Sequence, residues 1–407
     1  MRHDIWPVAM GAVFLVAVWV GDGTLAAVGL LGLLSQGLAW FWSRWALRGV
    51  EYQRTIRPER VFAGEATELT LSVANHKLLP LPWLQVEDQV PARLEYEAAP
   101  LSPSHQPLVR LLTRVTALGW FERVRWRYRV RCPARGYFPF GGVRLRAGDP
   151  FGLYPSQEER PKRDHVIVYP RALSLAQLGL PSRKPFGEVR GLERIYEDPS
   201  RIIGLRDYRP TDAMKRIDWM ATARRQTLQA RVYESTLTLQ VVIALNVDTF
   251  PFSWQGTDTA ALEAAISAAA SLARVAVEQR LQVGLIANGS LVESDQPVRI
   301  APSRHPQQLV HILEALATVT PMATVPFDRL LALEGSRLPW GVTVVVITAV
   351  MTGAIAQALA ALRQRGFRVS LVPAGGRSME PPPGVGLLHL PSMIDGATPP
   401  GQEAVSV

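Results

Sequence analysis

Leu239-Gln240-Val241-Val242-Ile243-Ala244-Leu245 is a short run of β-branched and aliphatic residues that predicts a buried strand. Further strands are expected over residues 281–287, 343–348 and 367–372, and helices over residues 260–279, 306–319 and 354–365. This alternation indicates a parallel sheet covered by helices on both faces. We therefore expect an α/β domain over residues 238–380, followed by a disordered tail over residues 381–407 that is rich in Pro, Gly and Ser.

A charged segment precedes this domain, within a stretch over residues 171–237 that we interpret as an ordered connector. It reads Arg206-Asp207-Tyr208-Arg209-Pro210-Thr211-Asp212-Ala213-Met214-Lys215-Arg216-Ile217-Asp218-Trp219. Interleaved Arg and Asp side chains predict a local network of ion pairs, because the Arg fork suits bidentate pairing with a carboxylate. Pro210-Thr211-Asp212 predicts a turn, with Asp212 capping a short helix that runs through Met214 and Trp219.

This segment, with Ala223-Arg224 after it, resembles the signature of the bacterial "domain of unknown function 58" family. Two positions depart from the pattern, since Thr211 stands where glycine is usual and Met220 where a lysine usually follows the tryptophan. Asp149-Pro150-Phe151-Gly152-Leu153-Tyr154 resembles a second motif of the family, which precedes the signature. The resemblance implies a von Willebrand factor type A-like domain at the carboxyl end and a MoxR-type AAA+ ATPase as partner.

Two roles are open for the charged and aromatic residues of the signature. They form either a latch that fixes the connector to the α/β domain, or a docking surface for a partner protein. The residues concerned are Arg206, Tyr208, Asp212, Arg216, Asp218 and Trp219.

The resemblance also implies a metal-ion-dependent adhesion site, which opens with Asp-x-Ser-x-Ser after the first strand. Here Asn246, Asp248 and Phe250 occupy those three positions, and Thr348-Ala349 replaces the aspartate expected after a later strand. A hard divalent cation needs several oxygen ligands and some anionic charge. We therefore expect a degenerate site that binds no metal, with remaining polar candidates Asn246, Asp248, Thr257 and Thr259.

Residues 46–170 show strand patterns and predict an antiparallel β-sandwich of roughly immunoglobulin size. The sharpest alternation places Arg123, Arg125, Arg127, Arg129 and Arg131 on one face of a strand. These arginines form either a solvated outer face or a cationic platform for lipid or an acidic partner.

Two apolar runs within residues 1–45 predict a transmembrane helical hairpin. Arg2 precedes the first run, Arg44 and Arg48 follow the second, and the turn between the runs carries Asp22. By the positive-inside rule both ends lie in the cytoplasm, which predicts a multi-pass protein of the inner membrane with cytoplasmic soluble domains. A cleavable signal peptide is the alternative, which the length of the second run disfavours.

Charge and reactive residues narrow the functional classes. The net charge is +9, and residues 44–239 hold 33 Lys and Arg against 21 Asp and Glu, which favours attraction to anionic lipid. The sequence shows no nucleic-acid motif, so we expect no nucleic-acid partner. The seven histidines have no metal-ligand or catalytic spacing, and Cys132 is a single thiol that we expect to be a small core residue.

The sequence therefore predicts a membrane-anchored α+β protein of several domains that has no catalytic residues and no cofactor. We expect a cytoplasmic scaffold or adaptor that binds protein, acting with a MoxR-type AAA+ ATPase in assembly of a protein complex. A metal-dependent binding domain or hydrolase is one alternative, and a basic lipid- or nucleic-acid-binding protein is another.

Overall fold

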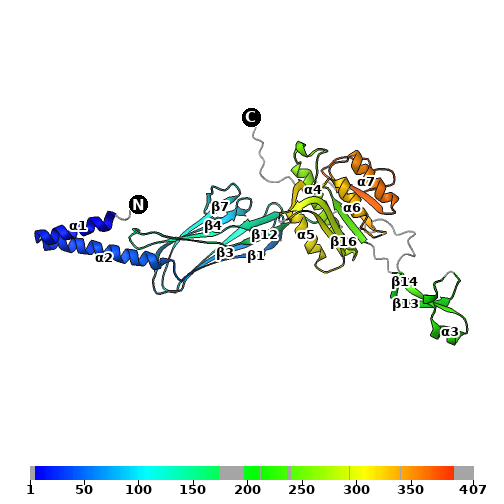
Figure 1. The fold of residues 1–407 in the computed structure, drawn as a ribbon, viewed down its shortest axis with the longest axis horizontal. Helices are drawn as coiled ribbons and strands as arrows, with labels where there is room; N and C mark the ends of the chain where they lie inside the picture. Colours follow the sequence, from blue (N-terminus) through cyan, green and yellow to red (C-terminus); the bar gives the residue numbers. More distant parts are fainter. Residues whose placement is uncertain are drawn as a thin grey trace. The chain divides into compact units, whose positions relative to one another are not determined.

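The computed structural model describes residues 5–173, 197–210, 212–235, 240–292, 294–339 and 341–388. Contacts between residues divide the chain into two compact units, and the boundary between them in the sequence falls between Arg171 and Ala172 (Figure 1). The fold is a mixture of helices and several separate sheets, as the sequence predicts at this level.

The first unit begins with two apolar helices, α1 (Ile5–Val20) and α2 (Gly23–Ala46). The Asp22 side chain caps α2 by accepting from the backbone N–H groups of Thr24 and Leu25, at 2.9 and 3.2 Å. Gly29 lets the helices approach closely, because a Cβ there would lie 2.8 Å from the Cα of Phe14. The 16 residues of α1 span about 24 Å, less than the roughly 30 Å of a hydrocarbon core.

Two helices in the described residues are long and apolar enough to cross a membrane, Gly23–Ala46 and Thr259–Glu278. In the second helix 78% of the most apolar 18-residue stretch is buried inside the protein, as in the core helix of a soluble domain, whereas in α2 the share is 17%. The candidate span is therefore α2, which supports membrane association in general terms.

The end of α2 is fixed to the β-structure that follows it. Ala46 and Leu47 belong to the same hydrophobic core as the strands. The Lys77 ammonium donates to three backbone carbonyls there, those of Trp45 at 3.0 Å, Arg48 at 2.5 Å and Ala46. These bonds satisfy carbonyls that have no partner within the helix.

The strands of the first unit form three sheets around one core. The sheet orders are β1-β3-β8-β5, β11-β10-β4-β7-β6 and β2-β12-β9. The strand bounds are β1 (Val50–Arg57), β2 (Arg60–Phe62), β3 (Ala66–Asn75), β4 (Leu81–Pro91), β5 (Glu95–Tyr96), β6 (Leu101–Pro103), β7 (Val109–Leu118), β8 (Arg123–Arg131), β9 (Gly136–Phe140), β10 (Val143–Ala147), β11 (Ser156–Arg160) and β12 (Asp164–Tyr169). Alternate residues of β1 and β8 point into the core, so one face of each strand is mostly apolar, with Arg54 as the charged exception on β1, and the other face is polar.

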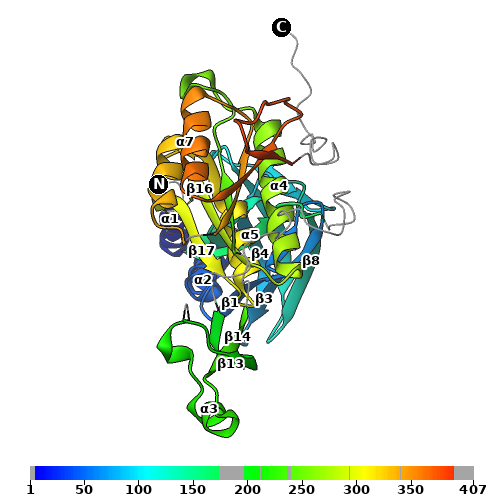
Figure 2. The same ribbon diagram turned by 90° about the vertical axis from the view of Figure 1, so that its right-hand side faces the viewer.

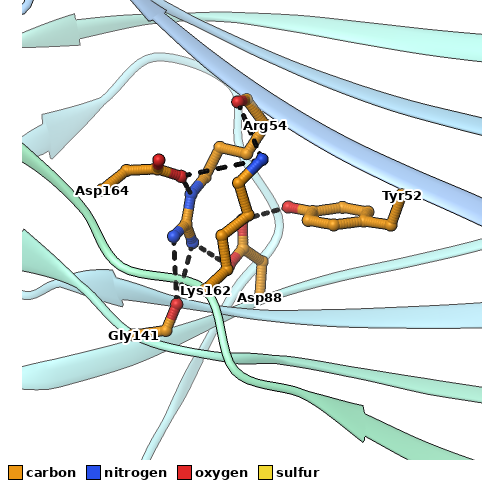
Figure 3. A network of polar contacts seen from close by, with 6 residues as sticks. All are labelled: Tyr52, Arg54, Asp88, Gly141, Lys162 and Asp164. Atoms are coloured by element: carbon orange, nitrogen blue, oxygen red, sulfur yellow. Dashed lines mark hydrogen bonds and ion pairs between the residues drawn. The ribbon is translucent and has the colours of Figure 1, made fainter.

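A buried polar network joins three of these strands (Figure 3). The Arg54 guanidinium donates to Asp88 at 2.5 Å and to Asp164 at 2.8 Å, and to the carbonyl oxygen of Gly141 at 3.1 Å. The Tyr52 hydroxyl donates to the second oxygen of Asp88 at 2.6 Å. The side chains of Arg54 and Asp88 are both fully buried, so the Asp88 charge depends on Arg54 for compensation, whereas Arg54 also pairs with Asp164.

The second unit contains a β-hairpin formed by β13 (Glu197–Asp207) and β14 (Gln229–Ser235). The loop between the strands holds a short 3-10 helix, η1 (Met214–Arg216), and α3 (Trp219–Arg225). This hairpin contains the whole of the charged signature.

The remainder of the second unit is an α/β sheet in the order β17-β16-β15-β19-β20-β21, with β18 paired to β16. Strands β15, β16, β19, β20 and β21 pair in parallel. The bounds are β15 (Gln240–Leu245), η2 (Ser253–Gln255), α4 (Thr259–Glu278), β16 (Gln282–Leu291), β17 (Ser294–Ser303), α5 (Gln308–Thr318), β18 (Val319–Ala323), α6 (Phe327–Gly335), β19 (Thr343–Thr348), α7 (Gly353–Gln364), β20 (Arg368–Pro373) and β21 (Gly386–Leu387).

Helices cover both faces of this sheet, as the alternation predicts. Helices α6 and α7 pack on Val242, Ala244 and their neighbours, and α4 and α5 pack together on the opposite face (Figure 2). Helix α6 and strands β17, β18 and β21 are additions that the sequence pattern does not reveal. Strand β21 extends the sheet into the segment expected to form the tail, because Val385 is buried beside β20; residues 389–407 lie outside the described residues.

Candidate functional site

The turn of the hairpin is held by a bidentate ion pair. The two terminal nitrogens of Arg206 donate to the two carboxylate oxygens of Asp212, at 2.7 and 2.6 Å. Asp212 also accepts the backbone N–H of Arg209 at 2.9 Å, and the Tyr208 hydroxyl donates to the Asp212 carbonyl oxygen at 3.1 Å. The hydrogen bonds from Arg206 and Arg209 lower the pKa of Asp212 to about 2. The carboxylate is therefore ionised at neutral pH and closes the loop.

Asp218, and not Asp212, caps the helix of the signature. Helix α3 begins at Trp219, and the Asp218 carboxylate accepts from the backbone N–H of Ala221 at 3.0 Å. The other Asp218 oxygen accepts from Nε of Arg231 on β14 at 2.9 Å. Both hydrogen bonds, led by that from Ala221, hold the pKa of Asp218 below its usual range. The prediction that Asp212 caps this helix was wrong, because Arg206 and Arg209 already occupy its oxygens.

The hairpin also carries exposed apolar side chains. Trp219 is 65% exposed, Met214 73% and Met220 77%, and Leu205 and Leu228 at the strand ends are also exposed. Met220 is one of the two departures from the family pattern, while Thr211, the other, lies outside the described residues. Arg216 is half-buried. The charged signature residues thus build a scaffold, and the apolar ones form an outward surface that we call the Trp219 patch, defined as Met214, Trp219 and Met220.

Both roles expected for the signature, the interdomain latch and the docking surface, stay predictions. The bonds of Arg206, Tyr208, Asp212 and Asp218 given above all join residues of the hairpin itself. The exposure of Met214 and Met220 on the hairpin could not be predicted from the sequence, because residue type alone does not determine exposure.

The degenerate adhesion site lies at the carboxyl ends of β15, β16 and β19. The Asn246 amide nitrogen donates to the Thr348 hydroxyl at 3.0 Å, and its oxygen accepts from the backbone N–H of Asp248 and from the Asn288 amide. Asn288 also donates to the Asp248 carboxylate at 2.8 Å. Burial raises the pKa of Asp248, while the bond from Asn288 opposes the shift.

An arginine spans the same edge of the sheet. The Arg377 guanidinium donates to the carbonyl oxygens of Thr249 and Ala349, at 2.8 and 3.1 Å, and to the Asp258 carboxylate at 3.2 Å. It also lies over the ring of Phe250, 5.3 Å from the centroid. The positively charged Arg377 side chain therefore neutralises Asp258 and binds the loops after β15 and β19.

These residues do not fit a divalent cation. The side-chain oxygen of Asn246 is already used by two N–H donors, its amide nitrogen cannot ligate a cation, and Arg377 adds positive charge nearby. Thr257 and Thr259 are exposed residues at the start of α4 and do not line the cavity of about 290 Å³ that Asn246 and Asp248 line. Among the described residues, no group of three or more His, Cys, Asp or Glu side chains could hold a metal ion.

The second family motif forms a loop around a buried carboxylate. Asp149 is fully buried and accepts from the backbone N–H groups of Phe151, Leu153 and Tyr154, at 2.8, 3.3 and 2.7 Å. The motif therefore has a structural explanation within the sandwich.

Comparison with known proteins identifies the family. Residues 204–393 match the model of the family described as "Protein of unknown function DUF58". This match confirms the family that the signature resembles. The uncharacterized protein YeaD of Bacillus subtilis (strain 168) is 24% identical over 286 residues, which cover 70% of this chain and 66% of that protein. The chain thus spans slightly less than two thirds of this relative.

Two solved structures show weaker similarity. An aerotolerance-related membrane protein from Bacteroides fragilis NCTC 9343 has 17% identity and a TM-score of 0.25, covering 34% of this chain and 68% of that one. A CARDB domain from Pyrococcus furiosus, in complex with di-metal ions, has 13% identity and a TM-score of 0.19, covering 29% of this chain and 89% of that one. At these TM-scores, neither similarity bears on the function of this chain.

Proposed function

We propose that this DUF58 family protein is a membrane-anchored scaffold that binds a protein partner through the β13–β14 hairpin. The observation that carries the proposal is the Trp219 patch, which places one tryptophan and two methionines on an ion-paired support. Exposed Trp residues are frequent binding hot spots, and flexible methionines adapt to the partner's shape.

The hairpin also holds the Trp219 patch in a fixed conformation before the partner binds. The pairs Arg206–Asp212 and Asp218–Arg231 fix the loop on each side of the Trp219 patch. A partner that binds a fixed loop has less conformational entropy to remove, so more of the contact energy appears as affinity.

The partner proposed from the family resemblance is a MoxR-type AAA+ ATPase acting in assembly of a protein complex. Arg209, Lys215, Arg224 and Arg225 are exposed around the patch. A basic rim around an apolar centre suits a partner surface that is apolar with acidic edges.

The hairpin of α1 and α2 is the proposed anchor, with α2 as its full-length span. Arg44 and Arg48 follow it, so the positive-inside rule favours a multi-pass protein of the inner membrane with both soluble units in the cytoplasm. The basic excess of the membrane-proximal half favours contact with anionic lipid.

We interpret the α/β unit as a von Willebrand factor type A-like domain that acts without a bound cation. Its order of parallel strands and the position of Asn246 and Asp248 after β15 support this interpretation. In this interpretation the Arg377 guanidinium, and not a metal ion, links the loops at the sheet edge.

The main test is capture of the ATPase from a detergent extract by the full-length protein, with ATP, with ADP and without nucleotide. Specific recovery that depends on nucleotide is expected. Trp219→Ala should lower the recovered amount about tenfold or more, by about 1.4 kcal/mol or more of binding free energy. Trp120→Ala is the matched control, because Trp120 is 68% exposed on the sandwich. An equal fall in recovered ATPase with both variants, or no recovered ATPase in any nucleotide condition, would contradict the proposal.

A separate test determines on which side of the membrane the two soluble units lie. Protease added to intact spheroplasts should leave both soluble units uncut, and lysis should expose them. Cleavage of the units in intact spheroplasts would contradict the proposed orientation.

A further inference from the structure

The outer face of the first sheet carries a row of arginines on β8. Arg123, Arg125, Arg127, Arg129 and Arg131 are all exposed, and the residues between them point toward the core. We call these five residues the arginine row. Successive members are two residues apart, which is about 7 Å along a strand.

The row has few carboxylates to neutralise it. Arg127 lies 3.6 Å from Glu68 and Arg131 lies 2.9 Å from Glu97, and all four side chains are at least 43% exposed. Exposed pairs of this kind contribute at most about 1 kcal/mol and leave the charges available. Within the described ranges, no carboxylate lies at ion-pairing distance from Arg125.

Small polar side chains lie beside the row. Arg125 is opposite Ser72 and Arg127 is opposite Thr70 on β3. Together with residues of β1, they line a shallow groove of about 550 Å³. Glu68, opposite Arg129, also lines this groove, which lies on the β3 side of the row. The short side chains of Ser72 and Thr70 leave the neighbouring arginines exposed.

The backbone of β8 is open on the side away from β3. The short strand β5 pairs there with Val130 and Arg131, and the Glu97 N–H reaches the Arg129 carbonyl oxygen. Across residues 123–128, the described part of the chain pairs no other strand with this edge. An open edge offers unpaired N–H and C=O groups to another strand.

We propose that the arginine row and the open edge of β8 form a second docking surface, which binds an extended acidic polypeptide segment as an added strand. Acidic residues at every second position of that segment would lie opposite the arginines, as in a cross-strand pair. The backbone of the segment would pair with the open edge of β8.

The observations favour a polypeptide over nucleic acid or lipid. The aromatic side chains of β8, Trp126 and Tyr128, lie on the core side of the strand, so the face lacks the stacking platform that single-stranded nucleic acid uses. A lipid surface has no backbone N–H and C=O groups to pair with the strand edge. This surface lies in the first unit and goes beyond the proposed function, since Trp219→Ala is expected to leave it intact.

The test uses the full-length protein in a zwitterionic detergent and labelled peptides followed by fluorescence anisotropy. One peptide alternates Glu and Thr, a second has the same composition with its Glu residues contiguous, and a third is the first with N-methylated backbone positions. The alternating peptide should bind at least fivefold more tightly than either of the others, and its affinity should fall as salt rises.

Substitution tests the same surface. Arg125→Glu combined with Arg127→Glu should weaken binding of the alternating peptide at least tenfold. Arg280→Glu combined with Arg304→Glu makes the same charge change at exposed positions of the second unit and should change affinity less than twofold.

Three results would overturn the proposal. Equal binding of the alternating and contiguous peptides would reduce the row to a nonspecific basic face. Absence of binding would leave it as a charged edge that prevents aggregation. Tighter binding of a single-stranded oligonucleotide, or of vesicles containing anionic lipid, would assign the row to those partners.

Discussion

Asp218 and Trp219 are neighbours in the signature, but their side chains have opposite roles. The Asp218 carboxylate bonds to Ala221 and Arg231 inside the hairpin, whereas the Trp219 side chain is 65% exposed. Asp218 caps the helix that begins at Trp219, so its carboxylate orders the backbone turn that carries the exposed indole. The signature therefore contains both the ion-paired support, which includes Asp218, and the exposed side chain of Trp219 that this support carries.

The support should depend on the shape of Arg206 as well as its charge. Arg206→Lys keeps the positive charge but loses the bidentate pair with Asp212, so we expect the hairpin to loosen. Amide hydrogen exchange over residues 205–232 should become at least several-fold faster, and capture of the partner should fall. Arg209→Lys is the control, because Arg209 bonds to Asp212 through its backbone N–H.

The same ion pair predicts the acid sensitivity of the hairpin. The pKa of Asp212 falls from 3.8 to about 2 because Arg206 and Arg209 donate to its carboxylate. A carboxyl group with a lowered pKa stabilises the folded form above its unfolded pKa and loses that contribution as the pH falls toward the folded pKa. Protection of the hairpin amides should thus be constant from pH 7 to about 5 and decline below about pH 4. In Asp212→Asn this decline should be smaller, with the part that Asp218 contributes remaining, and an unchanged decline would show that another group controls it.

The buried pair of Arg54 and Asp88 should be important for the sandwich. Asp88→Leu removes one of the two carboxylates that pair with the buried guanidinium. Because Asp164 remains at 2.8 Å, we expect a cost below the about 3–5 kcal/mol that is typical of a fully unpaired buried charge. A clear fall in the apparent Tm of the full-length protein in detergent is expected. Arg54→Met combined with Asp88→Leu removes both charges and should recover part of the loss. A double variant as unstable as the sum of the single ones would show that the two residues act independently.

Local sequence predicted the sheet better than it predicted the site. Strand β19 has the predicted bounds, and β15 and α4 begin within one residue of them, because unbroken β-branched or alanine-rich runs allow few alternatives. The signature correctly predicted ion pairs. However, Asp212 and Asp218 both follow turn-like residues, so the local sequence does not show which of them caps the helix. At the sheet edge the decisive partners are distant, since Asn288 lies 42 positions from Asn246 and Arg377 lies 128 positions from Thr249. Such contacts depend on topology and not on local pattern.

Cys132 should be unreactive in the folded protein. It is fully buried in the sandwich core, and burial raises the pKa of its thiol to about 11. The thiolate is the reactive form, and at pH 8 it makes up only about one thiol in a thousand. Labelling by iodoacetamide at pH 8 should be negligible in the native protein and complete in guanidinium chloride. Rapid native labelling would contradict the buried position.

Arg377 should be needed for the edge of the α/β sheet. Its guanidinium binds the loops after β15 and β19 and the Asp258 carboxylate, which also caps α4 through Ala261. Arg377→Met keeps much of the aliphatic stem but removes these donors, so we expect a lower apparent Tm and faster amide exchange at the start of α4. Arg304→Met is the matched control, because Arg304 is exposed on the same unit.

Calorimetry with Mg²⁺ and Mn²⁺ should give no stoichiometric heat with the unaltered protein. A clear heat that Asp248→Ala abolishes would show that the edge binds a cation despite the guanidinium, and would reverse our interpretation of this site.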